Sequence, residues 1–224
     1  MKVIACPMCG MLARLWTIRS GNTLDAMVWT DRKMEAPMFP GPPEITRCRR
    51  CGGFFWITDA KVVGEIPEGS DGKSIPVEWR RSGEVDRLGE SDCLEALRLS
   101  VARTRYQQMR LRILAWHAGN DRYRTRASQL QAGLEQAGRS PEAVANLECL
   151  IQMLGGSDPD SVLIRAEALR ELGRFAEALH LLDTELPPKY AGSAAVVRYL
   201  AQRGDTVVRR ISPRNSGGSF FIEG

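Results

Sequence analysis

Two Cys-x-x-Cys pairs constrain what this chain can fold into more than any other feature of its sequence. The first pair is "CPMC" at residues 6–9, and the second is "CRRC" at residues 48–51. Each turn of this kind points two sulfurs at one position, and two such turns complete the tetrahedral set of thiolates that zinc prefers. We therefore predict a Zn²⁺ site, with iron or a redox-active dithiol as the alternatives. Its predicted ligands are Cys6, Cys9, Cys48 and Cys51.

A site of this composition predicts a structural metal rather than a catalytic one. Four protein thiolates leave no coordination position for water or substrate. Residues 1–66 hold few large aliphatic side chains, so metal binding worth about 10–16 kcal/mol would supply the folding free energy that a core cannot. Gly10 and Gly52 follow the two pairs, where we expect positive φ. Arg49 and Arg50 would either offset the negative charge of the thiolates or lie in solvent.

Three stretches of residues 1–66 have the composition of strands: "LARLWTI" at 12–18, "DAMVWTD" at 25–31 and "FFWI" at 54–57. We predict that they form one small antiparallel sheet, a zinc ribbon. Its core would contain Trp16, Trp29 and Trp56. Phe54 and Trp56 point to one face of the last strand and its other residues to the opposite face. Because a three-stranded sheet cannot bury both faces by itself, we expect one face to dock onto the helical part that follows.

Residues 67–90 are predicted to be a connector that includes a short strand around "PVEW". The segment "EIPEGSDGKS" resembles a phosphate-binding loop, but Pro67 stands where that motif needs glycine. Pro76 would also interrupt the helix that holds the phosphate. The segment therefore does not predict nucleotide binding.

The composition predicts a globular protein of the cytoplasm. Apolar residues make up 43% and charged residues 26% of the chain, and the formal net charge is +4. No run of apolar residues is long enough to span a membrane. Only Val3–Ala5 precede Cys6 as an apolar run, which is too short for a lipoprotein signal. In a reducing compartment, closely spaced cysteines indicate metal ligands rather than disulfides.

From Ser91 onward the apolar period changes from two to about 3.6, which predicts one long helix that ends near residues 118–121. Its stripe would contain Leu99, Ala102, Tyr106, Met109, Ile113 and Trp116. Residues 98–126 include many arginines and a single acidic residue, Asp121. These arginines could meet acidic side chains of a packed neighbour, bind phosphate or lie in solvent. The candidate contacts with phosphate or an acidic partner are Arg49, Arg50, Arg98, Arg103, Arg105, Arg110 and Arg112.

The last part of the chain contains a repeat. "LEQAGRSPEAV" at 134–144 aligns with "LRELGRFAEAL" at 169–179, and "LAQRGDTVV" at 200–208 is a weaker copy. The first two segments are offset by 35 residues, and periods near this length are typical of stacked helical hairpins. Ser140 and Asp158, each followed by proline, are predicted N-caps. The predicted helices lie near residues 122–137, 141–154, 159–172, 175–186 and 192–203.

The segment 163–183 resembles tetratricopeptide repeats, with Leu172, Gly173 and Ala178 at motif positions. It differs in lacking the tryptophan of the first helix and in having Phe175 after the turn. "GNTLDAMVWTDRKMEAPMFP" followed by "RCRRCGGFFWITDA" resembles the N-terminus of uncharacterised bacterial proteins that join a zinc ribbon to such repeats. This resemblance implies the architecture and no known activity.

The sequence therefore predicts an α+β, mainly α protein that is not an enzyme. The predicted parts are a zinc ribbon (1–66), a linker (67–90), a tetratricopeptide-like hairpin array (91–211) and a tail (212–224). His117, His180, Cys93 and Cys149 belong to no catalytic motif. We expect an interaction scaffold for a protein or peptide. The alternative is a nucleic-acid-binding module that uses the cysteine turns and the arginine-rich segment 98–126; the oligomeric state is left open. In the tail, Phe220–Ile222 would add a strand to the ribbon or fill a groove of a neighbouring molecule.

Overall fold

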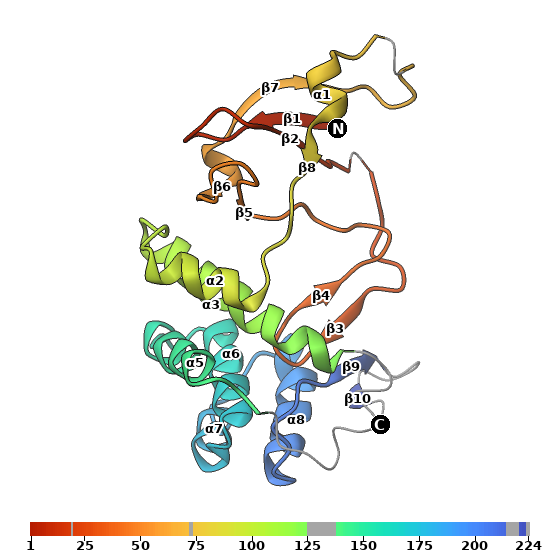
Figure 1. The fold of residues 1–224 in the computed structure, drawn as a ribbon. Helices are drawn as coiled ribbons and strands as arrows, with labels where there is room; N and C mark the ends of the chain where they lie inside the picture. Colours follow the sequence, from red (N-terminus) through yellow and green to blue (C-terminus); the bar gives the residue numbers. More distant parts are fainter. Residues whose placement is uncertain (19, 72–73, 125–137, 214–219, 223–224) are drawn as a thin grey trace.

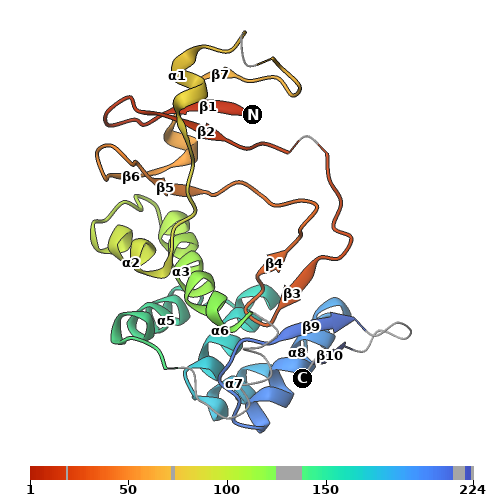
Figure 2. The ribbon, with the colours of Figure 1, turned by 45° about the vertical axis from the view of Figure 1, so that its right-hand side comes forward.

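The protein has an α+β fold, as predicted (Figure 1). The computed structural model describes residues 1–18, 20–71, 74–124, 138–213 and 220–222. A strand-rich part that contains the N-terminus and α1 lies at one end, and the other helices gather towards the opposite end (Figure 1, Figure 2). Every helix within these residues is too short or too polar to cross a bilayer.

Two small sheets form the N-terminal end. The first has the strand order β7-β1-β2-β8, in which β8 pairs parallel with β2 and the other pairs are antiparallel. Its strands are β1 (Lys2–Ala5), β2 (Leu12–Leu15), β7 (Lys61–Glu65) and β8 (Gly83–Glu84). The second sheet is the antiparallel hairpin of β5 (Ile45–Arg47) and β6 (Phe54–Trp56), which a short 3-10 helix, Ile57–Asp59, follows.

A third sheet joins the two ends of the chain, with the order β10-β9-β3-β4. Its strands are β3 (Met27–Trp29), β4 (Met34–Glu35), β9 (Arg210–Pro213) and β10 (Phe220–Ile222). The predicted single sheet is therefore wrong, because β2, β3 and β6 lie in three different sheets. Val28 of β3 pairs with Met34 of β4 on one side and with Ile211 of β9 on the other, and not with β2 or β6. The tail adds a strand here, since β10 pairs with β9.

The tryptophans separate accordingly. Trp29 and Trp56 are buried, but Trp16 is 59% exposed, so the predicted shared core of three tryptophans is also wrong. The segment "PVEW" is part of helix α1 (Val77–Arg81) and not a strand. Trp79 of α1 lies against β7 at Gly64, where a Cβ atom would be 1.9 Å from the indole ring. The predicted linker thus contributes both a helix and strand β8 to the N-terminal end.

The predicted long helix is two helices, α2 (Glu90–Arg98) and α3 (Arg105–Asn120). The N-cap of α2 is Gly89, two residues before Ser91, where the apolar period changes. Thr104 begins α3 with a capping box, in which Thr104 Oγ1 accepts from the Gln107 N–H at 3.1 Å and Gln107 Oε1 accepts from the Thr104 N–H at 3.3 Å. The break leaves Leu99 and Tyr106, two residues of the predicted stripe, 53% and 63% exposed.

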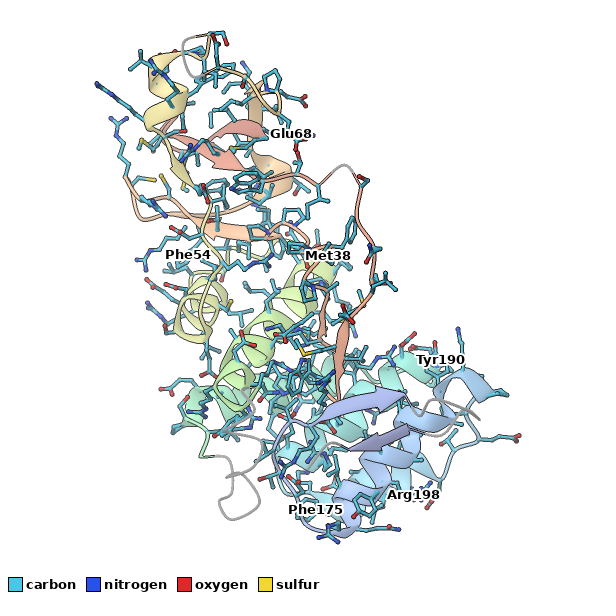
Figure 3. All side chains as sticks on the ribbon, turned by 90° about the vertical axis from the view of Figure 1, so that its right-hand side faces the viewer. Met38, Phe54, Glu68, Phe175, Tyr190 and Arg198 are labelled. Atoms are coloured by element: carbon cyan, nitrogen blue, oxygen red, sulfur yellow. The ribbon has the colours of Figure 1, made fainter. Side chains whose placement is uncertain are left out.

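The β5–β6 hairpin joins the two ends of the molecule through its two faces. Phe54 and Trp56 pack in one cluster with residues of α2 and α3, including Ala96 and Leu111. Figure 3 shows Phe54 where the hairpin meets the helices. Phe55 points the other way, into the cluster that contains the cysteines. The expectation that one face docks onto the helical part is confirmed.

The remaining helices are α5 (Pro141–Met153), α6 (Pro159–Glu171), α7 (Phe175–Leu182) and α8 (Pro188–Gln202). Both predicted N-caps are confirmed, since Ser140 accepts from Ala143 N at 3.1 Å and Asp158 from Ser161 N at 2.9 Å. The predicted helix 122–137 lies almost wholly outside the described residues. α7 ends earlier than predicted. α8 begins earlier than predicted, at Pro188, because proline is favoured in the first turn of a helix.

Two of the three repeated Leu-x-x-x-Gly segments, 169–173 and 200–204, are helix ends of one geometry, and the copy that begins at 134 lies mostly outside the described residues. Gly173 has φ 76° and donates to the Arg170 carbonyl at 2.9 Å, while Arg174 donates to the Leu169 carbonyl at 2.9 Å. Gly204 ends α8 with the same pair of bonds, to Ala201 and, through Asp205, to Leu200. Each is a Schellman motif, in which glycine takes the left-handed position.

Replacement of Gly173 by alanine is expected to destabilise the protein by about 1 kcal/mol, because alanine is strained at positive φ. A Cβ atom there meets nothing within 4 Å, so the cost is that of the backbone alone. The melting temperature should fall by about 2–4 °C. Gly41→Ala is the control, since a Cβ atom at Gly41 also meets nothing and its φ is not positive. Equal melting temperatures for the two variants would contradict the account of this turn.

Candidate metal centre

The two Cys-x-x-Cys turns have the same backbone geometry. In the first, Gly10 N donates to the Cys6 carbonyl at 2.9 Å and Cys6 N donates to the Met11 carbonyl at 2.9 Å. In the second, Gly52 N donates to the Cys48 carbonyl at 2.8 Å and Cys48 N to the Gly53 carbonyl at 2.9 Å. Gly10 and Gly52 both have φ 72°, so the predicted positive φ is confirmed. The turns connect β1 to β2 and β5 to β6.

The four sulfurs lie close together without being bonded. Cys6 Sγ is 3.9 Å from Cys51 Sγ, and Cys9 Sγ is 3.6 Å from Cys48 Sγ. All four lie within 4.8 Å of one another. A metal–sulfur distance of about 2.3 Å would place the sulfurs of a tetrahedron about 3.8 Å apart. The four cysteines therefore fit one metal ion, and the set has no place for a fifth protein ligand or for substrate.

The surroundings shift the pKa values of Cys6 and Cys48 in opposite directions. Burial raises the pKa of Cys6 to about 12. Burial also disfavours the thiolate of Cys48, but hydrogen bonds from the backbone N–H groups of Cys51 and Arg50 and from the neighbouring thiols of Cys9 and Cys51 together lower the pKa of Cys48 to about 7. A bound divalent cation would hold all four as thiolates, because a coordinating thiol loses its proton. The donor set, four soft sulfurs in a tetrahedron, suits zinc or iron.

Charged contacts fix the second turn to its surroundings. Arg49 binds Asp86 through two hydrogen bonds, one of them 2.7 Å long. Arg47 pairs with Asp92 and Glu95 of α2, both at 3.2 Å. Its guanidinium also lies 4.9 Å from the centre of the Phe54 ring. These contacts link the second cysteine turn to the segment that follows β8 and to α2, so the candidate metal site is tied to the helical part.

Most of the candidate arginines have partners within the chain. Arg110 pairs with Glu44, with one bond of 3.1 Å. Arg105 donates to the Met153 carbonyl at 2.8 Å, and Arg112 to Asn146 Oδ1 at 3.2 Å. With Arg49, four of the seven candidate arginines therefore bind other groups of the same chain. Arg50, Arg98 and Arg103 are exposed.

Sequence reasoning missed a buried ionic network at the tip of the β3–β4 hairpin. Asp31 at this tip is fully buried and accepts from Asn120 Nδ2 at 2.9 Å and from Arg124. His117 Nε2 lies 3.0 Å from the Asp31 carbonyl. Burial disfavours the charge of Asp31, but His117 and Arg124 outweigh it and lower the pKa of the carboxyl. The sequence "TDRK" at 30–33 has the composition of an ordinary turn, which does not predict that Asp31 is buried.

The network continues to Glu171 at the end of α6. Glu171 accepts from Trp116 Nε1 at 2.7 Å and from Asn120 Nδ2 at 3.1 Å, and it pairs with Arg139. Burial raises the pKa of Glu171 to about 8 against the attraction of Arg139. The side chains of Asp31 and Glu171 are wholly inaccessible to solvent, so they cannot reach a substrate. Their hydrogen bonds and ion pairs hold the hairpin tip, α3 and α6 together.

Comparison of the chain with protein-family models, with curated proteins and with solved structures found no match. The assignment of this centre therefore rests on its geometry. Within the described part of the chain, the four cysteines form the single group of three or more histidine, cysteine or acidic side chains placed to share a metal ion.

Proposed function

We propose that this protein is a non-catalytic scaffold for protein–protein interaction in the cytoplasm, held by a structural zinc ion at Cys6, Cys9, Cys48 and Cys51. In this proposal a zinc ribbon, residues 1–66, supports a tetratricopeptide-like helical array, residues 91–211, through the connector 67–90. The observation that carries the proposal is the closed set of four sulfurs, whose tetrahedral spacing suits a metal that takes no part in chemistry.

Two features of the helical part support the scaffold. The helix ends at Gly173 and Gly204 share one geometry, and the turn at Gly173 joins α6 to α7 as a helical hairpin. The core is a chain of small clusters rather than one centre: α3 packs on α5 and α6, and α6 packs on α7 and α8. Arrays built in this way present extended surfaces to a peptide or protein.

The nucleic-acid alternative has less support. A phosphate-binding surface needs several cations free to contact the backbone. Four of the seven candidate arginines are instead held by Asp86, Glu44, Asn146 and the Met153 carbonyl. The remaining three are few for a module that would bind nucleic acid by charge.

A capture experiment distinguishes the two functions. The tagged protein is used to isolate partners from a lysate of its own host, with one half of the lysate treated with nuclease. We expect a protein present in near-equal amount to the bait in both halves. Mass spectrometry identifies it, and absorbance at 260 nm reports nucleic acid. Loss of every partner on nuclease treatment, together with recovered nucleic acid, would contradict the scaffold.

A further inference from the structure

The turn that joins α2 to α3 carries exposed cationic and apolar side chains together. Arg98 and Arg103 are exposed, Leu99 is 53% exposed and Tyr106 is 63% exposed. We call these four residues the arginine turn. It projects at the side of the molecule in two views (Figure 1, Figure 2).

The charge of the arginine turn is not neutralised by the part of the chain that the structure describes. Within that part, the guanidinium groups of Arg98 and Arg103 have no hydrogen bond or ion pair. The nearest acidic residues along α2 are Asp92 and Glu95, and both are paired with Arg47. The arginine turn therefore keeps a local positive charge, although the net charge of the whole chain is only +4.

The backbone of the arginine turn is held in one conformation. Ser100 has φ 55°, a left-handed geometry that is costly for a residue other than glycine. Ser100 N donates to the Leu97 carbonyl at 3.0 Å, and Val101 N donates to the Ala96 carbonyl at 3.1 Å. The Thr104 capping box fixes the other end, and Trp56 Nε1 donates to the Val101 carbonyl at 3.4 Å. A surface fixed in this way loses little entropy when a partner binds.

We propose that the arginine turn is the docking surface for an acidic segment of a partner protein that also carries apolar side chains. The inference rests on the proposed scaffold function and names the chemistry of its partner. Arginine and tyrosine are enriched at protein interfaces, and arginine pairs with carboxylates in a bidentate geometry. Leu99 and Tyr106 supply apolar area beside the charges. Two arginines beside exposed apolar groups suit a peptide better than nucleic acid, which needs more phosphate contacts.

A direct binding assay tests this surface on the full-length, metal-loaded protein. The probe is a short fluorescent peptide of glutamate and leucine patterned as an amphipathic helix, compared with its glutamine analogue and with a single-stranded oligonucleotide. We expect the unsubstituted protein to bind the glutamate peptide best. Arg98→Glu with Arg103→Glu should weaken that binding by about tenfold or more. Leu99→Ala with Tyr106→Ala should also weaken it.

The matched control is Arg80→Glu with Arg81→Glu, which makes the same change of charge at exposed residues of α1. It should alter affinity by no more than about twofold. Failure to bind the glutamate peptide, an equal loss in the control or tighter binding of the oligonucleotide would each overturn the arginine turn as an acidic-peptide surface. All variants are first checked for an unchanged melting temperature, and substitution of exposed residues should meet that condition.

The capture experiment separates failure of this inference from failure of the proposed function. A partner that survives nuclease but is lost from the Arg98→Glu, Arg103→Glu bait, and not from the control bait, supports the arginine turn. A partner retained by both baits leaves the scaffold standing and rejects the arginine turn. Recovery of nucleic acid in place of any protein would reject the scaffold itself.

Discussion

Replacement of Cys48 by serine is expected to unfold the N-terminal end of the protein while leaving the distant helices folded. Cys48 lies in a small cluster in which Ile4, Leu15 and Phe55 are the large buried apolar side chains, with Ile57 and Val85 partly buried against them. So small a core cannot fold alone, and zinc binding contributes about 10–16 kcal/mol in comparable small domains. We expect loss of the bound metal, collapse of dispersed amide signals from β1, β2, β5 and β6, and retention of those from α6 to α8.

Cys149→Ser is the matched control, because Cys149 lies on α5, outside the sulfur cluster. That variant should keep its metal and its full set of dispersed amide signals. Added zinc should not restore the Cys48→Ser protein, since three ligands bind far more weakly than four. Full dispersion of the β1 and β6 signals in the Cys48→Ser variant would show that the N-terminal end folds without the four-cysteine site.

Replacement of Asp31 by alanine is expected to lower the free energy of unfolding by about 3 kcal/mol. Removal of one partner from a buried ion pair leaves the other charge uncompensated, which typically costs about 3–5 kcal/mol. Here the cationic partner, Arg124, is 4% exposed and keeps a second bond to Asp121 at 2.9 Å, which places the cost at the lower end. The midpoint of urea unfolding measures it, with the slope checked for a change in cooperativity.

The adjacent residue, Arg32, provides the control. Its ion pair with Asp160 is 2.5 Å long, but the two side chains are 34% and 50% exposed. Arg32→Ala should therefore cost less than about 1 kcal/mol. A double-mutant cycle of Asp31→Ala and Arg124→Ala should give a coupling energy of about 1–3 kcal/mol. If Asp31→Ala costs no more than Arg32→Ala, the buried network does not hold the hairpin to the helices.

The features that the sequence predicts well are those that neighbouring residues determine. The cysteine turns close through bonds between residues four or five positions apart, so their spacing and their glycines suffice to predict them. The N-caps at Ser140 and Asp158 depend on the next three residues, and both are correct. The prediction of one helix over α2 and α3 was wrong, although "TRYQ" at 104–107 has the spacing of a capping box, a local signal for the start of α3.

Contacts between distant residues could not be read in the same way. β3 takes β9 as its partner, and Arg209 N donates to Thr30 Oγ1 across 179 positions of the sequence. Asp31 is charged and lies in a turn, so its pattern favours exposure. It is buried because Asn120 and Arg124 from the end of α3 and the turn after it supply the compensating bonds. Sequence periodicity describes one element at a time and does not identify such partners.

The most direct measurement is the metal content of the purified protein, combined with X-ray absorption at the edge of the metal found. The account predicts one zinc ion per chain, coordinated by four sulfurs at about 2.3 Å. Cys48→Ser should abolish this signal and Cys149→Ser should preserve it. Protein that is folded at its N-terminal end with little bound metal, or a metal with nitrogen or oxygen ligands, would contradict the structural zinc site on which the proposed scaffold depends.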